Sequence, residues 1–210
     1  MDTRPAGPLS VIGGVVGGRP ISPGDVFVTR SESFVGEVIR HVERRRPEVG
    51  EPIVVEGEVR PWSYWNHAGI IEAAEGEDWV TIEAQGAGVV RGKLSDHAER
   101  AVFPLALDPR DAERGLGFAR WCLAGHGVGA VDAKGREIPA VGYGWWTDAS
   151  IAIDLYTPLG LHFRLGRTMI CSELASRHLE HAIGWIAPRI DTGHVMPSDL
   201  GHGAMALVRP

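Results

Sequence analysis

The chain has 210 residues, 44% of them hydrophobic and 23% charged, so it can bury one substantial core without disulfides or metals. Its formal charge of −6 argues against a general affinity for nucleic acid or anionic membranes. The two cysteines, Cys122 and Cys171, lie far apart in different sequence contexts, which argues against a disulfide framework and favours a reducing compartment.

The N-terminal stretch is rich in glycine and proline. We expect residues 1–22 to form a flexible arm, followed by a single domain over residues 23–210. No apolar run reaches the roughly 20 residues that cross a bilayer. The stretch from Leu9 to Val16 is short, glycine-rich and preceded by a single arginine, so it is a poor match to a signal peptide. We therefore expect a cytoplasmic protein without an integral membrane segment.

Two glycine-rich stretches do not match nucleotide-binding fingerprints. Residues 13–18 have the wrong glycine spacing, and residues 125–130 follow a predicted helix where the fingerprint requires a preceding strand. The sequence therefore predicts no bound cofactor.

A short strand and an amphipathic helix are the first predicted elements. Pro23-Gly24-Asp25 turns the chain into a strand over residues 26–29. Apolar residues at helical spacing then predict a helix from about Ser33 to Arg45, which ends before Pro47. Residues 53–55 form either a short strand or a covering loop.

Two strands around a polar turn predict a hairpin. The strands cover residues 65–71 and 79–84, and the turn is Glu75-Gly76-Glu77-Asp78. If the turn is centred on its first residue, His67 lies directly opposite Glu83. Opposed side chains in an antiparallel pair are about 4.5–5.5 Å apart at their Cβ atoms, so Glu83 can reach His67.

Further elements follow in the second half of the chain. A strand is predicted within residues 100–107, and Asp108 and Pro109 mark the start of a helix that continues to about Ala124. The adjacent Trp145 and Trp146 are more typical of a core or a pocket wall than of a ligand platform. Residues 151–155 are a weaker helix candidate.

Cys171 is predicted at the start of a helix whose apolar face begins at Leu174 and extends to Ile186. The free N–H groups of a first helical turn and the positive end of the helix dipole favour a thiolate, which makes Cys171 a candidate nucleophile. The nearest histidine on the same face, His178, lies about 10 Å along the axis and is too far away to serve as its base. The alternative is that Cys171 is a small buried residue at a helix end.

His67 is the predicted base and Glu83 the residue that orients it. A carboxylate beside an imidazole fixes its tautomer and stabilises the imidazolium that forms when a thiol gives up its proton. Gln85 lies on the same strand face and could take the role of Glu83 if the register differs. The alternative is that His67 and Glu83 form an ordinary cross-strand pair.

The remaining histidines are weaker candidates. His41 and His97 are predicted at the surface, and His178 and His181 on helix faces. Cys122 and His126 are four residues apart, but no partner motif with metal-ligand spacing lies near them. We therefore expect no metal site.

Five motifs occur in a recognisable order: Pro23-Gly24-Asp25-Val-Phe-Val, Asn66-His67-Ala-Gly-Ile-Ile, Thr81-Ile-Glu83-Ala, Ile170-Cys171-Ser-Glu173-Leu and Pro197-Ser-Asp199-Leu. This set resembles the circularly permuted NlpC/p60 group of papain-like thiol enzymes, particularly its YiiX/YebB-like branch. In that group the histidine strand precedes the cysteine helix, the reverse of papain, and His67 precedes Cys171 here.

The resemblance implies an α+β, papain-like fold in which an antiparallel sheet packs against the cysteine-bearing helix. It also implies that Cys171 is the nucleophile, His67 the base and Glu83 the orienting residue. The chain departs from the family pattern at Ile170, where an aromatic residue is common, and in residues 44–62, which form a longer segment than expected.

The expected function is that of a cysteine peptidase-like or amidase-like hydrolase that cleaves an amide (peptide or isopeptide) or ester bond through an acyl-enzyme. One alternative is a thiol acyltransferase of the lecithin retinol acyltransferase type, in which an amine or alcohol replaces water. Another is a non-catalytic binding module, favoured if Cys171 is buried and inert. A peptide, a protein conjugate or an acyl lipid all remain candidate substrates, and the oligomeric state stays open.

Overall fold

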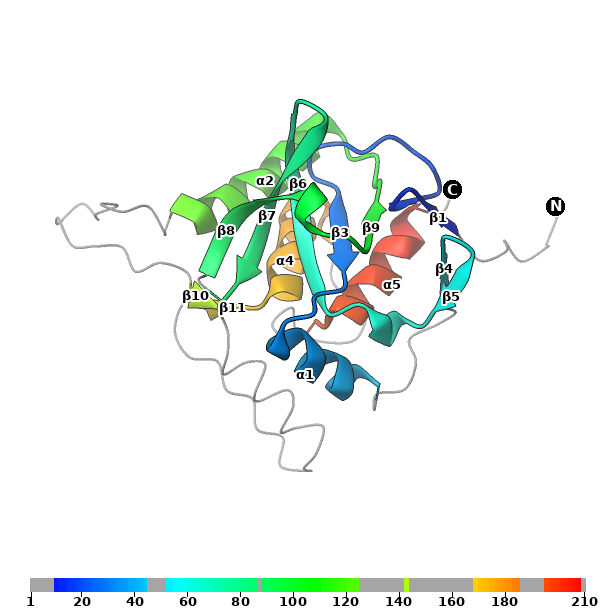
Figure 1. The fold of residues 1–210 in the computed structure, drawn as a ribbon. Coiled ribbons are helices and arrows are strands. Elements are labelled where there is room, and N and C mark those ends of the chain that lie inside the picture. The colour runs from blue at the N-terminus through cyan, green and yellow to red at the C-terminus, as the bar shows by residue number, and fades with distance from the viewer. Residues whose placement is uncertain are drawn as a thin grey trace.

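The computed structural model describes residues 10–44, 52–86, 88–124, 142–143, 168–185 and 195–208. Over these residues the chain forms one large mixed sheet with helices packed against it (Figure 1). The predicted α+β class is confirmed.

The strands of the main sheet are β1 (Ser10–Ile12), β2 (Val15–Val16), β3 (Val26–Thr29), β4 (Ile53–Val55), β5 (Glu58–Arg60), β6 (His67–Glu75), β7 (Asp78–Gln85), β8 (Gly88–Lys93) and β9 (Arg100–Phe103). A separate pair joins β10 (Gly142–Tyr143) to β11 (Thr168–Met169). The helices are α1 (Phe34–Glu43), α2 (Pro109–Ala124), α4 (Cys171–Ile183) and α5 (Pro197–Val208), with short 3₁₀ turns η1 (Trp62–Tyr64) and η2 (Leu94–Asp96).

Local sequence signals located many of these elements. The strand at residues 26–29 and the helix from Pro109 to Ala124 have the predicted bounds, and residues 53–55 form a strand. Strand β8 and helix α5 were not predicted. Residues 145–146 and 151–155 lie outside the described residues.

The main sheet has the strand order β5-β4-β1-β2-β9-β3-β6-β7-β8. The strands from β9 to β8 pair antiparallel, but β1 runs parallel to β4, and β2 runs parallel to β9. The sheet, which was predicted to be antiparallel, is therefore mixed. The cause is the β1–β2 hairpin, which inserts between β4 and β9 so that each of its strands has one parallel neighbour.

This hairpin also begins inside the predicted N-terminal arm. Residues 10–16 were expected to be flexible, but they pair in the sheet and Val16 is fully buried. Gly13 and Gly14 form the two-residue loop, with φ of 57° and 79°. A type I′ turn needs two positive φ angles, which glycine adopts without strain, so two apolar pairs around Gly-Gly are a hairpin signal.

Side chains on the two faces of the central strands enter different cores. One set shares a core with helices α2, α4 and α5, which lie behind the sheet in Figure 1. This core includes Val26, Val28, Ala68, Ile70 and Ile82 of the strands and Leu116, Leu174 and Leu200 of the helices. The alternating set, which includes Phe27, Ile71 and Val102, forms a smaller core with Leu94 of η2. Both faces of the central sheet are therefore covered.

The Pro23-Gly24-Asp25 turn connects three elements. Gly24 has a φ of 92°, and a Cβ there would lie 3.0 Å from the Cβ of Ala112 on α2. Its carbonyl oxygen accepts a hydrogen bond from Nε2 of His178 on α4, at 2.8 Å. The buried Asp25 carboxylate accepts from the backbone of Ser22 and Leu105, at 2.7 and 2.8 Å. The motif thus has a clear structural role.

The register of the β6–β7 hairpin differs from the predicted one. Glu75 pairs with Asp78 around the two-residue loop Gly76-Glu77, so the turn centre lies later in the chain than predicted. The register then shifts between Ile71 and Ala73, which leaves Glu72 as the extra residue of a β-bulge. The predicted direct opposition of His67 and Glu83 is therefore wrong.

The bulge decides which face the following residues occupy. Without it, the pairing set by the turn would place His67 and Glu83 on opposite faces of the hairpin, because a one-residue slip reverses every side chain. With the bulge, Ile70 pairs with Ile82. In this register His67 and Glu83 lie on the same face of the hairpin. The error in turn position and the missed bulge thus leave the predicted face unchanged.

Glu72, the bulge residue, is buried and held by two arginines. Arg91 on β8 donates through Nε and Nη2 at 2.6 and 2.9 Å, and Arg120 on α2 donates through Nε at 2.9 Å. These bonds hold the pKa of Glu72 below its usual range. The bulge is thereby fixed to both the neighbouring strand and a helix.

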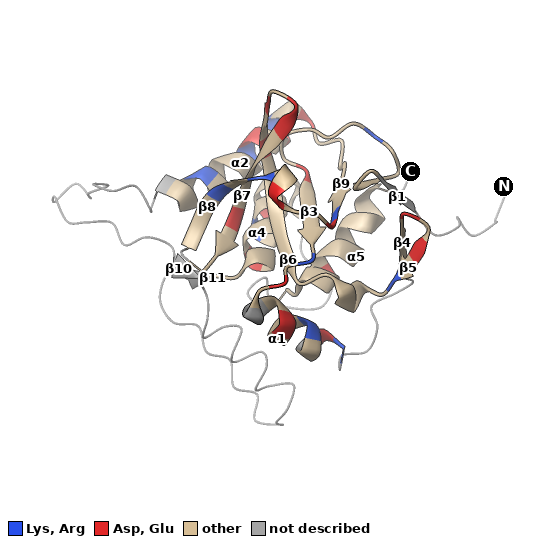
Figure 2. Ribbon diagram, in the orientation of Figure 1, with Lys and Arg blue, Asp and Glu red and all other residues tan. Residues whose placement is uncertain are grey.

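Charged side chains of both signs are interspersed on the described elements, and α1 carries both (Figure 2). Among the described residues, no helix is both long and apolar enough to span a bilayer.

The Glu72 ion pairs should contribute measurably to stability. We expect Glu72→Gln to lower the free energy of unfolding by about 1–2 kcal/mol, because a buried carboxylate loses charged hydrogen bonds to two guanidinium groups. Urea unfolding measures the change. The control is Glu75→Gln in the same strand. Its partner Lys93 and Glu75 are both more than half exposed, so the loss should be below about 1 kcal/mol. Equal losses in the two variants would contradict this role.

Candidate active site

Cys171 is the first residue of α4, as predicted. The preceding Ile170 has an extended backbone, and its carbonyl accepts the first helical hydrogen bond from Leu174 at 3.1 Å. Leu174 and Leu179 are fully buried and anchor the helix against the sheet. Cys171 itself is only 1% exposed. The helix therefore holds the thiol at its N-terminal end, inside the protein.

His67 and Glu83 are brought together by the β6–β7 hairpin. Continuing the observed register by one pair places Gly69 opposite Glu83, so the carboxylate reaches His67 along the diagonal. Nε2 of His67 lies 2.7 Å from Oε2 of Glu83. The contact expected from the sequence exists, although it arises from a different register.

Two glycines make room for the Glu83 side chain. A Cβ on Gly69 would lie 2.8 Å from Cγ of Glu83 and 2.6 Å from the Phe27 ring. A Cβ on Gly92 of β8 would lie 2.9 Å from Oε1 of Glu83. Any larger residue at either position would collide with the carboxylate side chain. The neighbouring strands therefore leave a slot in which Glu83 can turn towards His67.

The Glu83 carboxylate is fully buried and has four hydrogen-bond partners. Oε2 contacts His67 and accepts from Gln85 at 3.2 Å, while Oε1 accepts from the Thr81 hydroxyl at 2.5 Å and contacts His97 at 3.0 Å. Burial by itself would raise the pKa of Glu83. The hydrogen bonds to His67 and His97 outweigh burial and hold the pKa well below its usual range. Glu83 is therefore a carboxylate at neutral pH.

Charge on both sides acts on His67. Burial by itself would lower the pKa of its imidazole, but the charge of Cys171, the hydrogen bond to that residue and the Glu83 carboxylate raise it well above its ordinary value. Because Nε2 faces Glu83, Nδ1 is the nitrogen left for Cys171. The arrangement therefore sets the imidazole of His67 between Cys171 and the Glu83 carboxylate.

His97 belongs to this cluster, and its predicted surface position is wrong. Its side chain is only 15% exposed, and Nε2 lies 3.0 Å from Oε1 of Glu83. The His67 and His97 rings are 5.9 Å apart at their centroids. No local sequence pattern marks His97. Recognising β8 would have helped, because that strand and η2 carry the chain back to the hairpin.

Gln85, the alternative orienting residue, donates to Glu83. Of the two candidates left open by the sequence, Glu83 is the one that contacts His67 within the described residues. Gln85 lies at the rim of the cluster, where it adds a donor to the carboxylate.

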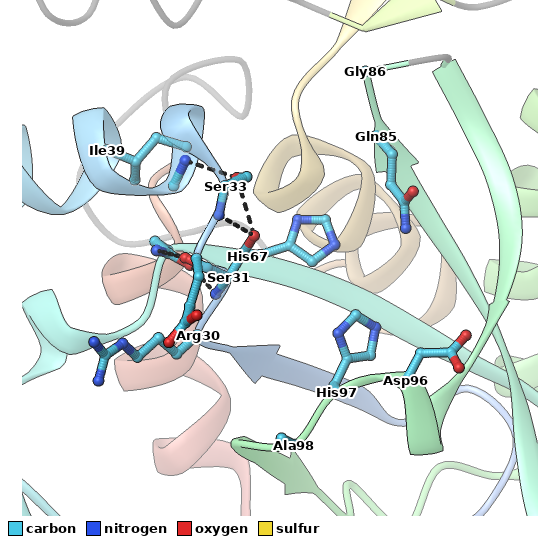
Figure 3. A pocket seen from close by; sticks show the side chains of 14 residues that line it. Arg30, Ser31, Ser33, Ile39, His67, Gln85, Gly86, Asp96, His97 and Ala98 are labelled. Atoms are coloured by element: carbon cyan, nitrogen blue, oxygen red, sulfur yellow. Dashed lines mark hydrogen bonds between the residues drawn. The ribbon is translucent and has the colours of Figure 1, made fainter.

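A cavity of about 630 Å³ opens beside the two histidines. Figure 3 shows His67, Gln85 and His97 converging on it. Its polar and charged lining also includes Arg30, Ser31, Glu32, Ser33, Asn66 and Asp96. Cys171 is not among the lining residues. Access to the cluster is therefore from the histidine side.

The second cysteine, Cys122, lies on α2 and is as buried as Cys171. Burial raises the pKa of its thiol to about 11. The possible partner His126 lies outside the described residues. Among the residues that are described, no group of three or more His, Cys, Asp or Glu side chains could hold a metal ion.

Comparison of the chain with protein-family models, with curated proteins and with solved structures gave no match.

The buried Glu83 carboxylate should make stability depend on acid pH. Its pKa is lower in the folded state than in the unfolded chain, so the stabilisation is complete above about pH 4.5 and is lost as the pH falls. Between about pH 5 and 3, we expect wild type to lose about 1–2 kcal/mol more unfolding free energy than Glu83→Gln. Urea unfolding at each pH measures this difference.

Glu77→Gln, at an exposed turn position, provides the control and should follow the wild-type pH dependence. If the unfolding free energies of wild type and Glu83→Gln change equally with pH, Glu83 is not an ionised, stabilised carboxylate in the folded protein.

Proposed function

We propose that this protein is a cysteine-dependent hydrolase that cleaves an amide or ester bond through an acyl-enzyme. The observation that carries the proposal is the buried arrangement of Cys171, His67 and Glu83, with the carboxylate 2.7 Å from the imidazole. A cysteine at a helix start, a histidine that contacts it and a carboxylate that orients the histidine are the three parts that thiol catalysis requires.

In the proposed reaction the Cys171 thiolate attacks the substrate carbonyl carbon and forms a tetrahedral intermediate. The backbone N–H of Cys171, at the positive end of α4, helps to stabilise the oxyanion. The His67 imidazolium then gives its proton to the leaving nitrogen or oxygen as the carbonyl–heteroatom bond breaks, which leaves a thioester. Water attacks the thioester, His67 takes a proton from that water, and the acid is released with regeneration of the pair.

The arrangement also supports the resemblance to permuted papain-like enzymes of the NlpC/p60 group. The histidine strand precedes the cysteine helix in the chain, and α4 packs against the strands that carry His67 and Glu83. We propose this fold relationship on the combination of chain order and site geometry.

The cavity favours a polar substrate. Nine of the fourteen lining residues that the structure describes have charged or polar side chains, and Ile39 is the only large apolar residue among these fourteen. An acyl lipid would remove water from these charged and polar groups, at a cost in binding free energy. We therefore favour a substrate with a peptide or isopeptide bond over an acyl lipid.

One observation favours the second candidate, a non-catalytic binding module. Cys171 is only 1% exposed and does not line the cavity. In such a module the cysteine would be buried and unreactive. Thiol reactivity therefore distinguishes the two functions without a known substrate.

Brief labelling with iodoacetamide at about pH 6 should modify Cys171 almost exclusively, because a thiolate paired with an imidazolium remains nucleophilic where an ordinary thiol is protonated. Mass spectrometry of the digested protein locates the label. Cys122 is a matched internal control, since both cysteines are buried. The selectivity should disappear in His67→Ala. Equal slow labelling of both cysteines, or no labelling of Cys171, would favour the binding module.

Acyl-enzyme formation can be tested with p-nitrophenyl acetate. We expect a burst of about one equivalent of nitrophenolate per protein molecule, followed by slower turnover as the thioester hydrolyses. Cys171→Ala should abolish the burst while urea unfolding shows an intact fold, and Cys122→Ala should retain it. A burst that survives Cys171→Ala would exclude Cys171 as the nucleophile.

A further inference from the structure

A second imidazole contacts the carboxylate of the proposed catalytic cluster. Nε2 of His97 is 3.0 Å from Oε1 of Glu83, and Nε2 of His67 is 2.7 Å from Oε2. Each carboxylate oxygen therefore has its own histidine. The cysteine–histidine–carboxylate mechanism accounts for His67 and assigns no role to His97.

The backbone around His97 is held independently of Glu83. Its N–H bonds to the carbonyl of Leu94 at 3.2 Å, and its carbonyl accepts from Nη1 of Arg100 at 2.6 Å. Leu94 is buried in the smaller core, and the His97 ring lies 5.3 Å from the Phe27 ring. The imidazole thus reaches the carboxylate from a fixed segment.

The bonds on the two oxygens restrict how the carboxylate can turn. Thr81 and His97 hold Oε1, and His67 and Gln85 hold Oε2. Rotation of the carboxylate would break the bonds on both sides. Thr81 comes from the same strand as Glu83, whereas His97 comes from a separate segment beyond β8. Of the two bonds to Oε1, the one from His97 therefore connects the carboxylate to another part of the fold.

We propose that His97 is a positioning residue, whose Nε2–H fixes Oε1 of Glu83 so that Oε2 stays directed at His67 throughout the reaction. The proposal rests on the hydrolase function proposed above. His97 acts through Glu83 and takes no part in bond making. It keeps the carboxylate aligned with the imidazolium that pairs with the Cys171 thiolate.

Two substitutions separate the hydrogen bond of His97 from the packing of its ring. His97→Gln keeps an N–H donor but removes the ring, and His97→Phe keeps a ring against Phe27 but removes the donor. His181→Gln is the control. That histidine stacks on Phe118 near the end of α4, outside the cluster. Urea unfolding reports whether each variant is folded.

The readout is the rate of Cys171 alkylation by iodoacetamide between about pH 4.5 and 9, which needs no substrate. We expect His97→Phe to slow the reaction at about pH 6 at least tenfold. The acid limb of its pH–rate profile should move upward by about one pH unit, because the imidazolium loses an aligned counter-charge. His97→Gln should stay within about threefold of wild type, and His181→Gln should match it. A purely structural role would lower the folded fraction without moving the acid limb.

Three results would overturn the positioning role: an unchanged profile in His97→Phe, a shift in His97→Gln but not in His97→Phe, or a His97 whose Nε2 carries no proton. The last is measured on wild type at pH 7 by nitrogen NMR of the histidine rings, so it does not depend on a variant that folds. Failure of the proposed function looks different, because wild-type Cys171 would then react no faster than Cys122.

Discussion

The site depends on one buried charge, the carboxylate of Glu83. Moving a carboxylate out of water costs several kcal/mol unless donors replace its hydration, and the protein supplies them from four side chains. It also supplies space, since Gly69 and Gly92 leave a slot where any other residue would collide with the carboxylate side chain. These donors and this slot come from β6, β7, β8 and the segment after η2, so the charge is tolerated only when all of them are assembled.

The bulge at Glu72 links the architecture of the sheet to the chemistry of the site. It lies five residues from His67 in the chain, yet it decides whether His67 and Glu83 occupy the same face of the hairpin. Arg91 and Arg120 hold the bulge residue from a strand and a helix. The geometry of the cluster is thus supported by ion pairs that do not belong to it.

The two cysteines are equally buried but have different surroundings. Both are nearly inaccessible, yet Cys122 lies within α2, where burial raises the pKa of its thiol, whereas Cys171 begins α4 and acts on the pKa of His67. The charges and dipoles around the two sulfur atoms therefore differ. In the proposed catalytic role, the substrate carbonyl reaches the buried Cys171 from the cavity beside the histidines.

The α+β class was implied by the family resemblance. The sequence by itself determined the features that depend on neighbouring residues: the start of the cysteine helix, the helix that begins at Pro109 and the placement of His67 and Glu83 in the two strands of one hairpin. These follow from apolar periodicity, capping residues and turn residues, which act over a few positions. Only the tertiary structure decided the register, the parallel pairs made by β1 and β2, and the place of His97. A bulge adds one residue to a strand and leaves no clear signal in a hydrophobic pattern. His97 contacts Glu83 only because β8 returns the chain to the hairpin. Such contacts join residues that are distant in the chain, and their energies are set by packing and by hydrogen bonds that no local pattern records.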